Sequence, residues 1–344
     1  MPIVRPVNPA TLKLATATAA SGDSVPIYDT SAGQHAKALI SDIVALVPAG
    51  TGALSSAGVI GRLSSVSATP DPTTDQASPG TVYWTPQAGG LSCALYDGAS
   101  TWTLFEGITE KSIALSGLTS GKNYDVFAYN NGGTPALELS AAWTTDTARA
   151  DALAQQNGIY VKSGATTRRW LGTIKATGAA TTADTALARY VWNTYNRLPR
   201  QVYVHDDTDS WAYGTATWHQ TRATAANKIE LVCGLTGLGA RLDLTANSYA
   251  ESAAPAGQWG TGIGEDSTTT PMTNTIGRVG TYPATNIGAP AGDSAWAWLK
   301  GHPVGTGYHY YAWLEIENTG GGATFYGDNG GTLFKTGMTG TWLC

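Results

Sequence analysis

Charged side chains are scarce in this 344-residue chain, since Asp, Glu, Lys and Arg together make up 13% of it, against about a quarter in ordinary soluble domains. The formal net charge is −5, and the arginines are scattered apart from the pair Arg168 and Arg169. A chain without an extended basic surface has little to offer a phosphate backbone. We therefore expect no nucleic acid among its partners.

Paired cysteines and long apolar runs are also missing. Cys93, Cys233 and Cys344 are odd in number and widely spaced, which argues against a disulfide framework and a structural zinc site. Two interpretations stay open, namely buried incidental thiols and a bridge between subunits through Cys344. The start of the chain lacks a charged segment followed by an apolar one, and no run approaches the roughly 18 apolar residues of a membrane span. We expect no membrane insertion, and assembly in a cytoplasm.

Glycine and aromatic residues take the place of the missing charge. The chain has 42 Gly, 16 Tyr and 12 Trp. Glycine weakens helix interiors, whereas aromatic and β-branched side chains suit strands. The length is enough for two or three compact units. The sequence therefore predicts an all-β protein built from several small domains.

Residues 1–63 are expected to form a small attachment segment. Within it, 25–28 predicts a short strand, 36–40 its return, and 41–47 a short apolar helix. A hairpin and helix of this size cannot bury enough apolar surface to stand alone, so the segment should dock on another protein or trimerise. The residues that follow, 64–80, are rich in Ser, Thr and Pro and predict a semi-extended linker.

Residues 81–146 predict a small β-sandwich. Turn signals separate six short strands, expected at 81–85, 91–96, 101–105, 112–115, 124–129 and 136–143. The segment 118–124, followed by alternating apolar residues, resembles the tyrosine corner of fibronectin type III domains. The segment is shorter than the roughly 100 residues of a complete seven-stranded sandwich. A truncated or related Ig-like sandwich is therefore expected, and a generic hairpin with a buried Tyr is the open alternative.

Residues 150–344 predict a jelly-roll-like β-sandwich. Short strands alternate with Gly-rich turns, and their number closes most naturally as two packed sheets. The strands are expected at 158–162, 168–175, 201–204, 211–220, 228–233, 239–247, 259–264, 296–299, 308–317, 324–326 and 332–335. Residues 185–198 fit both a helical and an alternating period, so the sequence leaves that segment open.

Three segments of this domain resemble a module that is widespread in structural proteins of tailed bacteriophages. They are 158–174 (GIYVKSGATTRRWLGTI), 190–197 (YVWNTYNR) and 264–271 (GEDSTTTP). The region 24–47 also resembles the leader that joins many phage fibres to the particle. The resemblance implies a virion component, a fibre or similar appendage, that forms a homotrimer and contacts other virion proteins through its N-terminal segment. It implies no catalytic residues and leaves head, neck, tail and baseplate locations open.

The strand at 308–317 is the strongest candidate for a ligand-binding face, because side chains alternate between two faces along a strand. The side chains expected to face the core are those of Tyr308, Tyr310, Ala312, Leu314 and Ile316. The other face is left to His309, Tyr311, Trp313, Glu315 and Glu317. Aromatic rings beside carboxylates suit sugar rings, which stack on Tyr and Trp and donate hydroxyl hydrogen bonds. A contact with a sister chain and plain exposure to solvent are the open alternatives.

Catalysis finds little support in the sequence. Glu315 and Glu317 are about 7 Å apart along the strand, which superficially fits paired glycosidase carboxylates, but carboxylates on one strand point in parallel. Asp207 and Asp209 form only a partial calcium-loop pattern, for which a solvated turn is the alternative. No nucleotide-binding, α/β-hydrolase or zinc-protease motif occurs. We predict a non-enzymatic protein with no cofactor and no metal.

The sequence thus predicts a structural protein of a phage virion that mediates attachment, with adhesion to host glycans through repeated weak sites as a further expectation. Two other hypotheses belong to different classes. A glycan-cleaving tailspike enzyme needs opposed carboxylates in a cleft. A carbohydrate-binding module encoded by the host needs a secretion signal.

Overall fold

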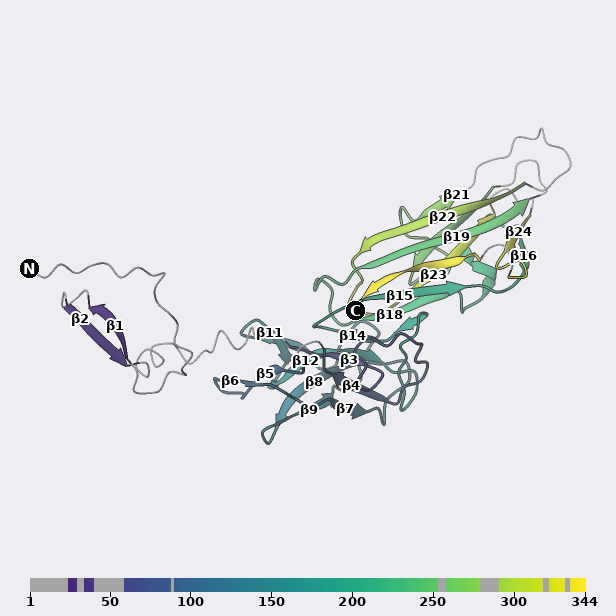
Figure 1. The fold of residues 1–344 in the computed structure, drawn as a ribbon. Helices are drawn as coiled ribbons and strands as arrows, with labels where there is room; N and C mark the ends of the chain where they lie inside the picture. Colours follow the sequence, from purple (N-terminus) through teal and green to yellow (C-terminus); the bar gives the residue numbers. More distant parts are fainter. Residues whose placement is uncertain are drawn as a thin grey trace, which may run out of the picture. The chain divides into compact units, whose positions relative to one another are not determined.

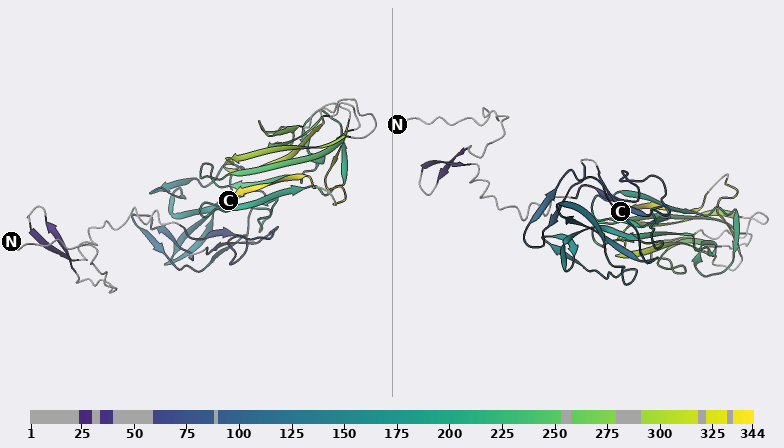
Figure 2. Two further views of the ribbon diagram at one scale, coloured as in Figure 1. Left: turned by 45° about the horizontal axis from the view of Figure 1, so that its top comes forward. Right: turned by 90° about the horizontal axis from the view of Figure 1, so that it is seen from below.

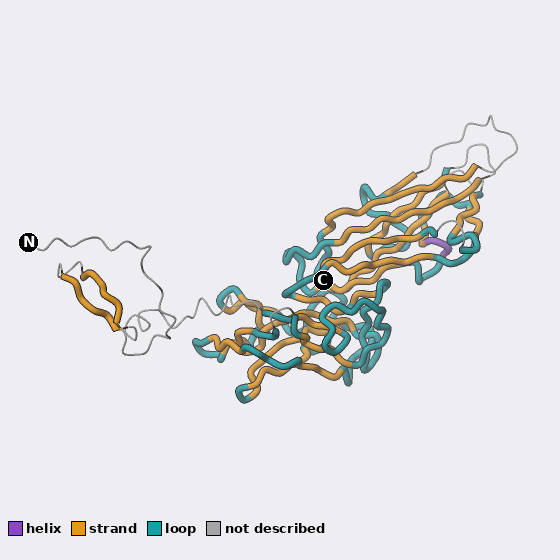
Figure 3. The backbone as a smooth tube through the Cα atoms, viewed as in Figure 1, coloured by secondary structure: helices purple, strands orange, loops and turns teal. Residues whose placement is uncertain are grey.

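The computed structural model describes residues 24–29, 34–39, 59–87, 90–252, 258–278, 291–317, 322–331 and 335–344. The chain divides into two units, Met1–Ala53 and Leu54–Cys344. Strands make up most of the regular structure (Figures 1 and 3), and the one helix in the described ranges is a single 3-10 turn, η2 (Thr221–Ala223). The expected all-β class is confirmed.

The first unit contains a β-hairpin. Its strands β1 (Ser24–Asp29) and β2 (Gln34–Leu39) pair antiparallel, with Val25 opposite Ala38. This is the hairpin expected from the sequence. The helix expected at 41–47 lies outside the described residues, and the part of this unit in attachment stays a prediction.

The second unit begins with a smaller β-sandwich. One sheet has the order β3-β4-β7, another pairs β5 with β6, and the largest runs β10-β11-β12-β8-β9 with β14 on β12. The bounds are β3 (Arg62–Ser64), β4 (Thr81–Thr85), β5 (Cys93–Tyr96), β6 (Trp102–Phe105), β7 (Lys111–Ala114), β8 (Asn123–Asn131), β9 (Thr134–Leu139), β10 (Leu153–Gln156), β11 (Ile159–Lys162), β12 (Ala165–Lys175) and β14 (Val191–Asn193). Leu63, Trp84, Val126 and Ile174 lie in its buried core. The six strands expected between 81 and 146 are all present.

The smaller sandwich does not end at residue 146, as the sequence suggested. Strand β12 lies beside β8 in one sheet, and β10, β11 and β14 extend that sheet. Strands beyond the expected boundary thus complete a sandwich that residues 81–146 are too few to close. The expected tyrosine corner is present, since the Tyr124 hydroxyl accepts a hydrogen bond of 2.7 Å from the backbone N–H of Thr119.

The segment 64–80, expected to be a semi-extended linker, is instead held against other parts of the second unit, to which it belongs. The buried guanidinium of Arg200 pairs with Asp71 at 3.0 Å and donates to the Pro72 carbonyl at 2.7 Å. Strand β3, which ends at the first residue of this segment, pairs with β4. The segment was predicted to be a linker because it has few apolar side chains. Hydrogen bonds and ion pairs from its backbone carbonyls and carboxylate to buried partners can hold a segment in place equally well.

The second unit continues into a jelly roll (Figures 1 and 2). One sheet has the order β15-β25-β19-β22, with β16 and β24 prolonging it, and the other β18-β23-β20-β21, with β13 and β17 beside them. The bounds are β13 (Ala188–Arg189), β15 (Pro199–His205), β16 (Ser210–Tyr213), β17 (His219–Gln220), β18 (Lys228–Cys233), β19 (Leu242–Ser252), β20 (Trp259–Glu265), β21 (Ile276–Arg278), β22 (Ala291–His302), β23 (Gly307–Glu317), β24 (Ala323–Tyr326) and β25 (Gly337–Leu343). This strand order is that of a jelly roll, as expected. Residues 185–198 form β13 and β14 instead of a helix.

Two stacked tryptophans join the smaller sandwich to the jelly roll. Trp170 in β12 and Trp192 in β14 have ring centroids 5.5 Å apart. Both belong to the same buried cluster as Cys233 and Leu242 of the jelly roll. Gly234, which follows β18, lies directly against the two rings. The two sandwiches therefore share one continuous core at this joint.

Replacing Gly234 by Ala is expected to destabilise the second unit by about 1–3 kcal/mol, because the joint has no space for a methyl group. An added Cβ would lie 2.4 Å from Cε3 of Trp192 and 2.7 Å from Cζ2 of Trp170. Urea unfolding measures the change. Gly80→Ala is the matched control, since its nearest neighbour would be 3.5 Å away, and it should change stability by at most about 0.5 kcal/mol. Equal stabilities for the two variants would contradict the tight joint.

Candidate functional site

The candidate face on β23 is buried, and the sequence-based assignment of its two faces is inverted. Side chains alternate as expected, but Tyr311, Glu315 and Glu317 are 0% exposed and Trp313 is 1% exposed, while His309 is partly buried. These residues point into the space between the two sheets. They do not form a ligand-binding surface of the protein.

Hydrogen bonds between the sheets explain the inversion. The Trp313 indole donates to Ser248 in the opposite sheet at 3.0 Å and to Thr261 at 3.1 Å. Indole and phenol rings bury more apolar area than the Ala and Leu side chains on the alternate positions. Of the alternate positions, Ala312 and Leu314 are buried as well. Trp218 and Pro271 lie over this outer side of the sheet, against Gly262.

The carboxylate of Glu315 fastens a turn to the jelly roll. It accepts hydrogen bonds from the Trp211 indole at 2.9 and 3.1 Å and from the backbone N–H of Arg222 at 2.9 Å. His219 Nε2 lies 2.9 Å from the same carboxylate. A carboxylate enclosed in this way is not accessible to a substrate, so Glu315 and Glu317 do not form a glycosidase pair.

The acidic loop after β15 also uses its carboxylates internally. Asp206 accepts hydrogen bonds from Arg222 Nε at 2.8 Å and Asn227 Nδ2 at 2.7 Å. Burial opposes ionisation of Asp206, but these hydrogen bonds outweigh it and lower its pKa. Asp207 pairs with Lys335 at 3.0 Å. Across the described ranges, no three His, Cys, Asp or Glu side chains are grouped to hold a metal ion.

The three cysteines are buried free thiols. Burial raises the pKa of Cys93 and of Cys233 to about 12, which leaves them protonated and unreactive at neutral pH. Cys344 is 1% exposed. The suggested bridge between subunits through Cys344 would require the chain end to leave the core, and the structure gives it no support.

Stability is expected to fall as the pH rises above neutrality because of His309. Burial disfavours its imidazolium, but the hydrogen bond to Asp266 at 2.7 Å and the charges of Asp266 and Glu265 outweigh it and raise the pKa of His309 above its ordinary 6.5. A histidine whose pKa is higher in the folded than in the unfolded state stabilises the fold. This contribution is complete below the unfolded-state pKa and is lost as the pH rises through the folded-state pKa. The urea midpoint should therefore decline as the pH rises above about 6.5, and less so in His309→Gln. An equal decline in both proteins would contradict this origin.

The outer face of the sheet β15-β25-β19-β22 carries the most exposed aromatic side chains of the jelly roll. Trp298 is 57% exposed, Trp296 45% and Tyr203 38%. We call this surface the open face and define it by four cross-strand rows, which are Trp298–Thr245–Thr339–Tyr203, Trp296–Asn247–Gly337–His205, Ser294–Tyr249–Tyr326–Ser210 and Gly292–Glu251–Thr324–Ala212. Cross-strand partners share one face of a sheet. In the first two rows, rings at the edges therefore border a centre of small side chains, whereas in the third row the rings of Tyr249 and Tyr326 occupy the centre.

A carboxylate with two phenols occupies the third and fourth rows. Tyr249 and Tyr326 donate to Glu251 at 3.0 and 2.9 Å, and their ring centroids are 5.6 Å apart. Partial burial and the Glu251 carboxylate raise the pKa of Tyr249 to about 12. The phenol therefore stays protonated and remains a donor.

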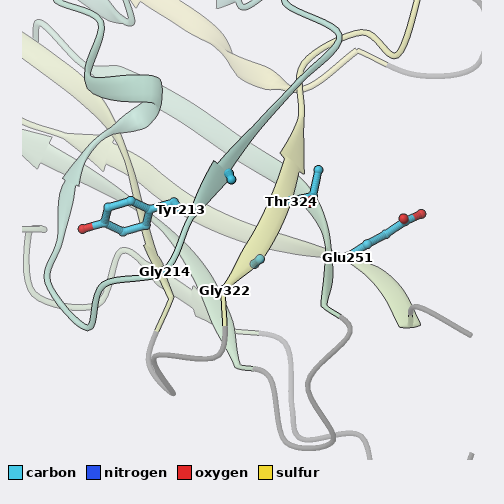
Figure 4. Close-up of a pocket in the computed structure, with 7 residues that line it drawn as sticks. Tyr213, Gly214, Glu251, Gly322 and Thr324 are labelled. Carbon is cyan, nitrogen blue, oxygen red and sulfur yellow. The ribbon is translucent and has the colours of Figure 1, made fainter. Parts of the chain in front are cut away.

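A pocket of about 330 Å³ lies where the fourth row ends. Ala212, Thr324 and Glu251 line it from the open face, together with Tyr213 and Gly322. Figure 4 shows Tyr213 and Glu251 on opposite sides of this pocket. The open face and the pocket were not anticipated from the sequence. The signal was present in β22, where Trp296 and Trp298 alternate with small or aliphatic residues.

These features define the class of the second unit as a jelly roll joined to a smaller sandwich, with one aromatic sheet face open to solvent. No family model matches the chain, and no curated protein matches it. Among solved structures, Eiger TNF from S. frugiperda is 10% identical with a TM-score of 0.27, over 43% of this chain and 92% of its own. The insecticidal delta-endotoxin Cry8Ea1 from Bacillus thuringiensis is 10% identical with a TM-score of 0.25, over 83% and 52%. Likenesses this weak carry no argument. No helix in the described part of the chain is long and apolar enough to span a membrane.

Proposed function

We propose that the protein is a non-enzymatic structural protein of a tailed-phage virion, a fibre or similar appendage that assembles as a homotrimer. In this proposal, the hairpin unit attaches the chain to other virion proteins. The jelly roll presents an adhesive surface toward host glycans. Symmetry then multiplies individually weak contacts through effective concentration.

The proposal is supported by the structural role of two of the segments that resemble phage proteins. Residues 158–174 and 190–197 supply β11, β12 and β14, including the tryptophan stack of the joint. Their polar groups serve internal bonds, such as the Arg169 guanidinium to the Ala94 carbonyl at 2.8 Å and the Asn193 side chain to the backbone of Leu63 at 2.6 Å. Side chains that join two sandwiches through internal contacts are what a structural component of a particle requires.

Labelling of purified particles tests the location. Gold-conjugated antibodies against the full-length chain should decorate particles of the phage or prophage that encodes it. Light scattering should give about three times the chain mass of 35.7 kDa. Unlabelled particles, or a monomer at micromolar concentration, would contradict the proposal. Release of reducing sugar from bacterial polysaccharide would instead favour the tailspike-enzyme hypothesis.

A further inference from the structure

We infer that the open face is a binding platform for a neutral saccharide chain. The inference rests on the proposed adhesive function and gives it a place in the fold, on the side of the sandwich opposite to Trp218. It moves glycan binding away from the buried strand β23. Three features of the open face carry it, namely its rings, its polar centre and its charge.

The two tryptophans of β22 supply the stacking surface. Trp296 and Trp298 are two positions apart on one strand, so their side chains leave the same face about 6.6 Å apart along it. Each keeps about half of its surface in water. An exposed indole offers a flat apolar surface to the CH groups of a sugar ring and an N–H to its hydroxyls. Tyr203, at the far edge of the first row, adds a third ring.

The centre of the open face supplies hydrogen bonds. Thr245 and Thr339 lie between Trp298 and Tyr203, and Asn247 lies beside Trp296. Hydroxyl and amide groups donate and accept, as sugar hydroxyls do. These side chains are also short, so they leave room for a ligand above the sheet between the aromatic edges.

The charge of the open face favours a neutral ligand over an anionic one. Its rows contain no Lys or Arg, and the Glu251 carboxylate is held by Tyr249 and Tyr326. Glu251 also lines the pocket of about 330 Å³, so a sugar unit seated there would lie beside this residue. The pocket volume lies at the small end of the range for ligand sites.

A second copy of the chain fits this surface less well. The cores of subunit interfaces are apolar and depleted of groups that need water. Here the middle of the first two rows holds Thr245, Asn247 and Thr339, which would be buried without internal partners. In the third row the middle is formed by Tyr249 and Tyr326, whose hydroxyls are bonded to the Glu251 carboxylate. The outer side of the other sheet is different, because Trp218 and Pro271 already lie over it.

Glycan binding by the full-length protein tests the inference. The probes are maltohexaose, cellohexaose and chitohexaose, together with an array of immobilised bacterial O-antigen and capsular polysaccharides. The parent should bind at least one neutral probe, and Trp296→Ala and Trp298→Ala should each weaken that binding about tenfold or more. Both residues are exposed, so the melting temperature should stay unchanged. Ile276→Ala is the matched control, since Ile276 is 43% exposed on β21 and is not part of the open face.

Several outcomes would overturn the inference. They are no binding of the parent to any probe, binding only to acidic polysaccharides, or equal binding by the parent and both tryptophan variants. Loss of the oligomer in Trp296→Ala or Trp298→Ala, seen by light scattering, would assign the open face to a sister chain. If particles were gold-labelled but the protein bound no glycan, only the glycan-binding inference would be contradicted. Glycan binding without labelled particles would sink only the virion assignment.

Discussion

Replacing Asp125 by Ala is expected to lower the free energy of unfolding of the second unit by about 3–5 kcal/mol, the cost of leaving a buried charge without its partner. The side chain of Asp125 is fully buried and pairs with Arg149 at 2.8 Å. It also accepts hydrogen bonds from the indoles of Trp143 and Trp170 at 3.0 Å and from the Thr173 hydroxyl at 2.6 Å. The substitution strands all four donors at once.

The effect of Asp125 should reach both sandwiches, because the same Arg149 also donates to the carbonyl of Gly234 in the jelly roll. Urea unfolding followed by tryptophan fluorescence is therefore expected to show one earlier transition rather than a separate loss of the smaller sandwich. Asp151→Ala is the control. Its carboxylate is partly exposed beside Lys162, and its loss should cost at most about 1 kcal/mol. If Asp125→Ala also lowered the free energy of unfolding by no more than about 1 kcal/mol, this role of Asp125 in linking the two sandwiches would be contradicted.

The positions of many strands could be predicted from the sequence. Strands β4 and β18 begin and end at the expected residues, Thr81–Thr85 and Lys228–Cys233. In both, a short run rich in β-branched and aromatic or aliphatic residues contrasts with its neighbours. Strand β25 was missed, because its glycines, Gly337 and Gly340, mimic a turn. Both instead lie in tight contact with neighbouring backbone, where a Cβ would not fit.

The pairing of strands could not be predicted in the same way. Alternation shows that a segment is a strand, but it does not name the neighbour. The strand expected at 168–175 was therefore assigned to the second domain, expected to begin at residue 150, whereas β12 lies beside β8 in the first sandwich. The segment 64–80 was misjudged for a related reason, since the partners of Asp71 and Pro72 lie more than a hundred residues away at Arg200.

The candidate site shows the limit of alternation most clearly. In β23 the pattern identified two faces but not which one is buried, because both carry aromatic or apolar groups. The carboxylates of Glu315 and Glu317 suggested solvent. Burial of a carboxylate is tolerated when hydrogen bonds replace its water, and the donors for Glu315 come from Trp211 and Arg222, remote in sequence. The sequence of the strand itself therefore does not indicate these hydrogen-bond donors.

Glu315→Ala is expected to destabilise the second unit by about 3–5 kcal/mol, because the Trp211 indole and the Arg222 N–H lose their common acceptor and His219 loses the carboxylate beside its Nε2. Glu315→Gln should cost less, since its amide oxygen can still accept one of these bonds. Urea unfolding measures both changes. Glu106→Ala, at an exposed position, should stay within about 0.5 kcal/mol of the parent.

The same variants separate a structural carboxylate from a catalytic or binding one. Under conditions where the Glu315→Gln variant remains folded, this variant should bind the saccharide probe with the affinity of the parent. The reason is that Glu315 lies between the two sheets, whereas the open face is on the outside of one of them. A catalytic carboxylate would behave in the opposite way, with polysaccharide cleavage in the parent, none in Glu315→Gln, and little change in stability. That combination would show that the buried network opens to admit a substrate.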